Sequence, residues 1–203
     1  WFYGTTFSAK YKKDKDQLTI GGAYTRYKGL HYGKIIWSEV SVPKDYKWYD
    51  LNAFKNDFNI YTKYQHRIAT RWEAFADLQF RSVTHTINGF RKTPTLKLDN
   101  QFNFFNPKIG LSYADTKGWL GFASFSVGNK EPNREDFEAG VNHQPKHETM
   151  YDMELNIEHR ADIYTWSATG YYMEYKSQLV LTGRINEGGA DTRTNVPKSY
   201  RAG

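Results

Sequence analysis

Apolar and polar side chains alternate residue by residue over long stretches of this chain. In residues 54–65, Phe58 and Ile60 lie on one side of an extended segment. Asp57 and Lys63 lie on the other side. A pleated strand repeats every two residues, whereas a helix repeats about every 3.6 residues. The segment is therefore predicted to be a strand with one apolar side and one polar side.

The same period recurs along most of the chain. After a short turn, Trp72 and Leu78 share a side opposite Glu73 and Gln79, which predicts a hairpin with the preceding strand. Phe75 is an apolar exception on the polar side. Further strands are predicted at residues 3–12, 17–27, 108–114, 118–128, 149–158 and 164–181. In 118–128 and 164–181 apolar residues occur on both sides, so the pattern leaves the facing of these two strands open.

The composition excludes a disordered chain and a helical membrane protein. Aromatic residues make up 17% of the chain, whereas disordered segments are poor in them. The mean hydropathy is −0.78, and no run approaches the roughly 20 consecutive apolar residues of a membrane helix. A transmembrane β-barrel remains compatible, because its strands alternate in polarity and need only about 10 residues to cross.

Short and long connections alternate between the predicted strands. Short links are predicted at residues 13–16, 67–70, 115–117 and 160–163, and long links at 28–51, 84–107, 129–147 and 182–195. Outer-membrane barrels combine short periplasmic turns with long extracellular loops. Aromatic residues such as Trp72, Trp119 and Trp166 stand near predicted strand ends, as at a membrane interface; cross-strand packing in a soluble sheet is the alternative for them. We predict an all-β fold, an antiparallel transmembrane β-barrel segment of about eight to nine strands with alternating short turns and long loops.

The chain carries no motif for catalysis, metal binding or nucleic-acid binding. It has no Gly-x-Ser-x-Gly elbow, no phosphate-binding Gly-Lys-Ser/Thr loop and no His-Glu-x-x-His helix. The net charge is +6, but Lys and Arg are scattered among acids, so no nucleic-acid partner is expected. Pro145 separates His143 from His147 and prevents a regular helix from aligning them, so no metal site is expected. We expect neither an enzyme nor a bound cofactor.

The most specific motifs lie between residues 118 and 203. A predicted strand ends in a Lys-x-Pro-Asn turn, and a Pro-x-x-Glu element opens a later strand with an acid inside it. The positions concerned are Lys130, Pro132, Asn133, Pro145, Glu148 and Glu154. Over its whole length the chain resembles the barrel of TonB-dependent receptors, and residues 171–183 and 195–203 resemble members from Bacteroidetes-type bacteria. Lys146 follows Pro145, whereas the family has Lys before Pro, so no role is carried over to this Lys.

The resemblance implies a bacterial outer-membrane barrel of roughly twenty-two strands. Residues 1–203 then form part of a single barrel domain, which is incomplete and lacks the N-terminal plug. The implied function is active uptake of a scarce nutrient, with a ferric siderophore, haem or cobalamin favoured over a glycan. The implied partners are outer-membrane lipid, the TonB complex acting through the missing plug, the small-molecule nutrient and a surface lipoprotein.

The long connections supply the candidate ligand contacts, because aromatic rings and cations together bind anionic or planar ligands. These candidates are Tyr32, Trp37, Trp48, Tyr49, Arg91, Lys130, Arg134, Arg184 and Arg193. For Lys130 and Arg134 the alternative is an ion-pair clamp with Glu131 and Glu135 that holds the loop. Two other functions stay open, a complete small outer-membrane barrel acting as an anchor or adhesin, and an outer-membrane enzyme, for which no nucleophile and base have suitable spacing.

Overall fold

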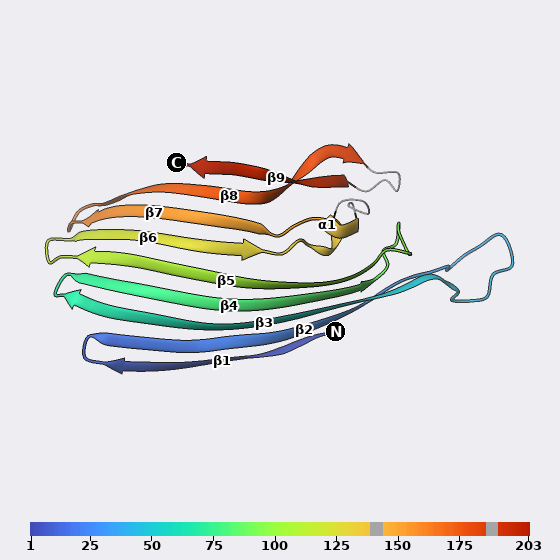
Figure 1. Ribbon diagram of the computed structural model, residues 1–203, viewed down its shortest axis with the longest axis horizontal. Coiled ribbons are helices and arrows are strands. Elements are labelled where there is room, and N and C mark those ends of the chain that lie inside the picture. Colours follow the sequence, from blue (N-terminus) through green and yellow to red (C-terminus); the bar gives the residue numbers. More distant parts are fainter. Residues whose placement is uncertain (139–143, 186–190) are drawn as a thin grey trace.

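The computed structural model describes residues 1–138, 144–185 and 191–203, and it shows one antiparallel sheet of nine strands in chain order (Figure 1). The strands are β1 (Phe2–Lys13), β2 (Asp16–Lys34), β3 (Lys47–Ala69), β4 (Trp72–Asn88), β5 (Lys97–Ala114), β6 (Trp119–Lys130), β7 (Glu148–Arg160), β8 (Thr165–Ile185) and β9 (Asp191–Ala202). The predicted all-β antiparallel fold is confirmed. A short helix, α1 (Arg134–Glu138), follows β6 and was not predicted by the two-residue pattern. No helix in the described part of the chain is long and apolar enough to cross a membrane.

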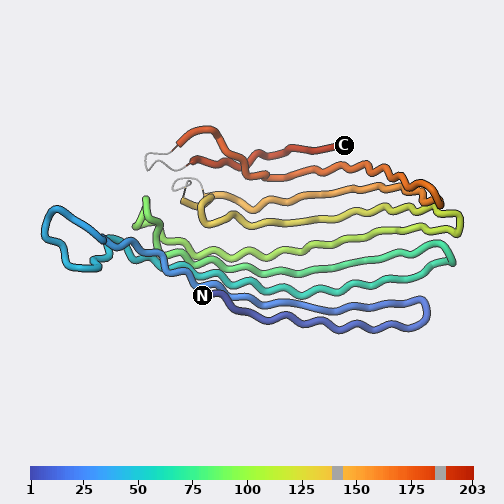
Figure 2. The backbone as a smooth tube through the Cα atoms, turned by 180° about the vertical axis from the view of Figure 1, so that it is seen from behind, coloured from blue at the N-terminus to red at the C-terminus, as the bar shows by residue number. Residues whose placement is uncertain are grey.

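Short turns join the strands at one end of the sheet, at residues 14–15, 70–71, 115–118 and 161–164, as predicted. At the other end, the connections at 35–46 and 89–96 are shorter than the predicted long links at 28–51 and 84–107. The difference arises because hydrogen-bonded pairing continues after the apolar pattern has ended. Backbone pairing does not require apolar side chains. The β2–β3 hairpin consequently projects well beyond the rest of the sheet (Figure 2).

The two faces of the sheet differ in polarity as the alternation predicts. Directly paired residues share a face, and Ile60 pairs with Phe80, which pairs with Phe105. The register also shows which residues of β6 and β8 face outwards, which the sequence pattern left open. Phe125 of β6 pairs with Met153, and Met153 pairs with a tyrosine of β8. Further exposed apolar residues on this face are Phe7, Ile20, Leu78, Ile109, Leu111, Leu155, Ile157 and Tyr172. None of the described segments covers this continuous apolar face, as is typical of the lipid-facing side of a barrel wall.

The apolar band has the height of a membrane. On β4 it runs from Trp72 to Phe80, which at about 3.3 Å per residue gives about 26 Å along the strand. A strand tilt of about 40° reduces this to about 20 Å, close to the height of an outer-membrane barrel's apolar belt. At the short-turn end, the Trp72 ring centroid lies 4.9 Å from that of Tyr113. The Trp119 and Trp166 ring centroids lie 5.7 Å apart. These rings stand at the strand ends as predicted and pack across neighbouring strands; their position at a membrane interface stays a prediction.

The turn between β5 and β6 depends on Gly118. Its φ is +87°, and a Cβ at this position would meet the backbone carbonyl of Arg160. We expect Gly118→Ala to lower the free energy of unfolding of the full-length protein by about 1 to 2 kcal/mol, because an L side chain is strained in this conformation. Urea titration in lipid vesicles measures this effect. Lys117→Ala in the same turn is the control and should change it by less than about 0.5 kcal/mol; equal losses would contradict the prediction.

Candidate functional site

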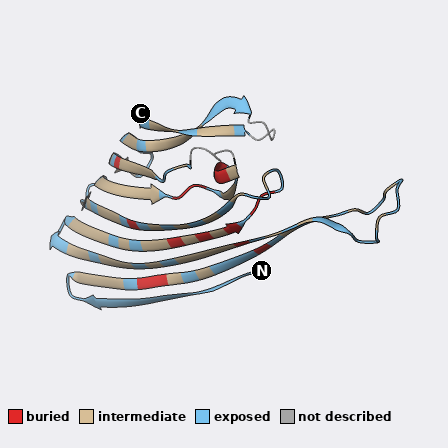
Figure 3. Ribbon diagram, turned by 45° about the vertical axis from the view of Figure 1, so that its right-hand side comes forward, coloured by how far each residue is buried: buried red, intermediate tan, exposed pale blue. Residues whose placement is uncertain are grey.

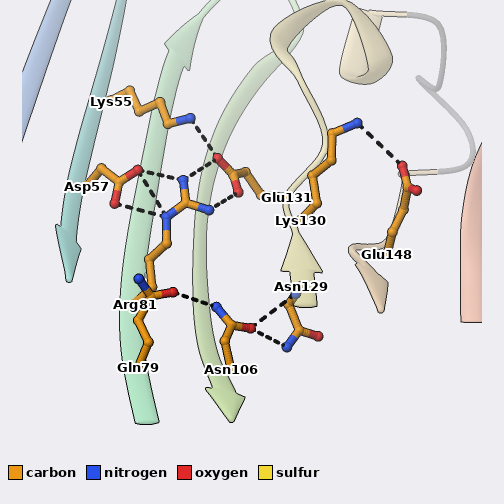
Figure 4. A network of polar contacts seen from close by, with 9 residues as sticks. All are labelled: Lys55, Asp57, Gln79, Arg81, Asn106, Asn129, Lys130, Glu131 and Glu148. Atoms are coloured by element: carbon orange, nitrogen blue, oxygen red, sulfur yellow. Dashed lines mark hydrogen bonds and ion pairs between the residues drawn. The ribbon is translucent and has the colours of Figure 1, made fainter. Parts of the chain in front are cut away.

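A half-buried ion-pair cluster lies on the inner face where β6 ends (Figure 4). Arg81 of β4 lies between two carboxylates, with its guanidinium 2.5 Å from Asp57 Oδ2 and 2.8 Å from Glu131 Oε2. The ammonium of Lys55 lies 2.7 Å from Glu131 Oε1. Pro132, which has no N–H to donate, follows directly after Glu131 and stops the strand ladder. The cluster ties the segment after β6 to β3 and β4.

The charge of Glu131 depends on this cluster. Burial by itself would raise the pKa of Glu131, but hydrogen bonds from Lys55 and Arg81 outweigh it and lower the pKa from 4.5 to about 2. Because the folded-state pKa is depressed, the contribution to stability is complete above about pH 4.5 and is lost as the pH falls towards 2.

We therefore expect α1 to undock in this acidic window. Hydrogen exchange of the amides at 131–138 in the full-length protein, corrected for intrinsic rates, should accelerate between pH 4.5 and 2. Glu131→Gln should exchange faster already at pH 7 and should accelerate less than the wild type in this window. Protection in the wild type that is unchanged down to pH 2 would contradict the expectation.

Helix α1 is held on the inner side of the sheet by a cap and by a buried ring. The Asp136 carboxylate accepts a hydrogen bond of 2.6 Å from the backbone N–H of Asn133, which is one half of a capping box. Phe137 is 1% exposed. The buried apolar cluster around it comprises Ala53, Ile87, Phe90 and Phe137. The hydrophobic core of the described chain therefore lies under α1, near the long-connection end of β3 and β4 (Figure 3).

Cationic and aromatic side chains gather beside α1. The rings of Trp48 and Tyr49 on β3 meet edge to face with centroids 4.4 Å apart. The guanidinium of Arg91 lies 5.4 Å from the centroid of the Trp48 ring. The guanidinium of Arg134 lies 4.6 Å from the centroid of the Phe90 ring, and it donates a 3.2 Å hydrogen bond to the carbonyl of Gly89. Phe90 directly precedes Arg91, so the two arginines belong to one region.

A third arginine extends this region to β9, where Arg193 lies 2.9 Å from Asp136 Oδ1. We call the region the arginine–aromatic set, and its members are Trp48, Tyr49, Phe90, Arg91, Arg134 and Arg193. Within the described residues, neither Arg91 nor Arg134 forms an ion pair with a carboxylate. Guanidinium groups beside aromatic faces and without an acidic partner suit an anionic group on a planar or conjugated ligand.

The other predicted contacts lie outside this set. Tyr32 points to the outer face with the Lys47 ammonium 4.9 Å from its ring centroid, and Trp37 is 79% exposed in the projecting β2–β3 connection. Arg184 is exposed on β8. The prediction that these residues lie in loops was wrong for Tyr32, Trp48, Tyr49, Lys130, Arg184 and Arg193, which are strand residues. The strands continue past the membrane because their backbones stay paired in water.

The family-motif positions have structural roles. Lys130 ends β6 and its ammonium lies 3.8 Å from Glu148 at the start of β7. Pro132 and Asn133 lead into α1, and Pro145 precedes β7. Glu154 lies on the inner face of β7, paired with Ser124 and Tyr171. His143 lies outside the described residues, and the ring centroid of His147 lies 5.5 Å from that of Phe104.

The ion pairs expected to hold the segment between β6 and β7 involve other cations than those predicted. Glu131 does pair with cations, but these are Lys55 and Arg81 and not the neighbouring Lys130 or Arg134. The alternation placed Lys55, Asp57 and Arg81 on the polar side without marking them as a cluster. Their opposite charges on neighbouring strands were the available signal. Glu131 lies 50 residues from Arg81 in sequence, and no local pattern connects them.

A meander of long strands with a lipid-facing outer side, a polar inner side and an inward-folded connection defines a segment of an outer-membrane β-barrel. The model of the family described as TonB dependent receptor-like, beta-barrel, matches residues 1–203. The chain belongs to this family, and it is an outer-membrane protein segment. A comparison with curated proteins gives no significant match. The resemblance of residues 171–183 and 195–203 to members from Bacteroidetes-type bacteria stays a prediction.

Solved structures of low sequence identity share the fold. The copper transporter OprC superimposes with a TM-score of 0.83 at 14% identity, over 100% of this chain and 33% of that one. The FrpB iron transporter from Neisseria meningitidis gives 0.67 at 13% identity, over 99% and 32% of the two chains. The ferric-catecholate import receptor Fiu from E. coli K12 gives 0.64 at 12% identity, over 100% and 34%. The chain thus spans about a third of these proteins. Its described strands do not pair β1 with β9, as a closed small barrel would require.

Proposed function

We propose that this chain is part of a receptor that takes up a scarce nutrient across the outer membrane. The observation that carries this proposal is the arginine–aromatic set on the extracellular side of the apolar band, beside the inward-folded helix α1. Of a ferric siderophore, haem, cobalamin and a glycan, an anionic ferric siderophore fits this set best. Among the described residues, Arg91 and Arg134 are cations without an ion pair, and Trp48 offers a flat apolar surface.

The remaining parts of the proposal concern segments outside residues 1–203. Uptake against a gradient needs an energy source, and we assign this to a plug in the lumen that contacts the TonB complex. A surface lipoprotein as a further partner stays a prediction. The names of the similar structures, which are copper, iron and ferric-catecholate transporters, support a nutrient-uptake function for the whole protein.

Deletion of the gene for the complete receptor tests the proposed function. Cells lacking it are offered ferric siderophores, haem, cobalamin and oligosaccharides in turn under limitation for that nutrient. We expect loss of uptake for a ferric siderophore. Normal uptake of all four classes would contradict the receptor function, and loss of a neutral oligosaccharide alone would contradict the choice of ligand.

Arg91→Ala and Arg134→Ala should each weaken ligand binding by about tenfold or more, because a hydrogen bond to a charged group contributes about 1.5 to 3 kcal/mol. Binding of the ferric siderophore identified by the deletion experiment is measured on the purified complete receptor. Lys44→Ala, in the exposed β2–β3 connection, removes the same charge outside the set and is the control. Equal affinity in all three variants and the wild type would show that the set does not contact the ligand.

A further inference from the structure

The outer face of β2 becomes cationic where the apolar band ends. Even-numbered residues from Leu18 to Tyr24 face lipid, because Tyr24 pairs with Phe58 and both belong to the apolar face. The next two residues with the same facing are Arg26 and Lys28, and both are exposed. We call this pair the β2 basic patch.

The patch lies at the level of the outer-leaflet headgroups. Arg26 pairs with Tyr3 on β1 and with Asn56 on β3, one row beyond Tyr24 and Phe58 towards the long-connection end. Tyrosines are the residues that barrels place at the membrane interface. The hydroxyl of Tyr24 donates a 3.3 Å hydrogen bond to Asn56 Oδ1, which turns its polar tip away from the apolar band.

No carboxylate in the described chain balances this charge. Neither Arg26 nor Lys28 forms an ion pair there, and the Lys28 ammonium lies 5.8 Å from the Phe54 ring centroid. The nearest acid along this face of β3, Asp50, already lies 2.7 Å from the Lys47 ammonium. On β4 and β5, the Arg26 row holds the neutral residues Thr84 and Gln101. The Lys28 row holds Thr86 and Asp99; the Asp99 carboxylate lies three strands away and accepts a 3.3 Å hydrogen bond from Thr86. Among the described residues, the positive charge is therefore local to β2, and no carboxylate pairs with it.

We propose that Arg26 and Lys28 bind the phosphate groups of an anionic glycolipid headgroup in the outer leaflet. The Arg26 guanidinium offers a planar fork that matches phosphate oxygens, and the Lys28 ammonium adds a second charge two residues further along the same face. Tyr3 and Tyr24 supply the adjoining apolar surface for the upper acyl chains. This site is on the lipid side of the wall and is separate from the arginine–aromatic set.

The test uses the purified complete receptor in a neutral detergent at fixed ionic strength. Diphosphorylated lipid A and its fully dephosphorylated form are the probes, and binding is followed by native mass spectrometry. We expect Arg26→Gln combined with Lys28→Gln to bind diphosphorylated lipid A at least about tenfold more weakly than the wild type. The dephosphorylated lipid should bind weakly to both proteins.

Two control variants test whether weaker lipid A binding comes from loss of the two cations on the outer face. Lys63→Gln removes a cation from the inner face of the same hairpin, where its ammonium lies 5.2 Å from the Phe75 ring centroid, and it should bind lipid A normally. Lys28→Arg retains the charge and should also bind normally, which separates charge loss from misfolding. Equal binding of both lipid forms would mean that the cations merely extend into the interface, and would overturn the proposal. Competition by a few millimolar inorganic phosphate would instead assign the site to free phosphate and would also overturn it.

Discussion

Leu78→Arg is expected to lower the free energy of unfolding of the complete receptor by about 2 kcal/mol. A cation on the lipid face of a barrel costs about 2 to 4 kcal/mol at the middle of the bilayer and less towards the interfaces, and Leu78 lies one row from the middle of the β4 band. Leu78 lies within the apolar band of β4, between Thr62 of β3 and Pro107 of β5 in the register. Its side chain is 43% exposed in the isolated segment, because its covering is lipid and not protein. Urea unfolding in lipid vesicles measures the loss.

Gln79→Arg is the matched control, since it places the same side chain one residue along on the inner face. It removes the 2.9 Å hydrogen bond that Gln79 accepts from Asn106, so a loss of about 1 kcal/mol is expected from that cause alone. If the two variants lose equal stability, the assignment of lipid and lumen to the two faces is wrong. If Gln79→Arg loses more, the faces are reversed.

Arg81→Met is expected to destabilise the complete receptor by about 3 kcal/mol, because it leaves two carboxylates in one half-buried site with a single cation. The side chain of Arg81 is 23% exposed and that of Glu131 is 8% exposed, so water screens this pair only in part. Lys55 alone then faces both Asp57 and Glu131. We also expect trypsin to cleave faster after Lys130 and Arg134, as α1 loses its attachment to β4.

A double-mutant cycle tests whether the loss comes from the ion pair. In a Glu131→Gln background, Arg81→Met should cost clearly less than in the wild type, since one of the stranded carboxylates has already been removed. The same cost in both backgrounds would show that Arg81 stabilises the wall through Asp57 or through packing, without its ion pair to Glu131.

The strands, and the facing of β3, β4 and β7, could be read from the chain because both are local properties. The alternation through Phe58, Ile60 and Leu78 requires only that neighbouring side chains point to opposite sides of a pleat. It places the apolar face correctly on β3, β4 and β7. The alternation fails at strand ends such as Lys34 and Asn88, where pairing continues beyond the apolar outer face and the buried apolar residues, such as Ile87, lie on the inner face under α1.

The grouping of the candidate ligand contacts, in contrast, could not be read from the sequence. The composition of the long connections pointed to Trp48, Arg91 and Arg134, and the structure does bring these three into one region. It leaves Trp37 and Arg184 apart from them. Which cations gather depends on how the segment after β6 folds back over the wall, and this is a long-range event that residue types alone do not encode.

The sequence by itself determined that the chain forms extended antiparallel strands with one apolar and one polar side, because covalent geometry sets the two-residue period within a strand. Only the tertiary structure decided that Glu131 reaches Arg81 and Lys55, that Phe137 seats α1 on the inner wall, and that β6 and β8 face as they do. Those features depend on the register between strands and on contacts across tens of residues. Their free energy comes from burial and charge pairing that exist only after the sheet has formed.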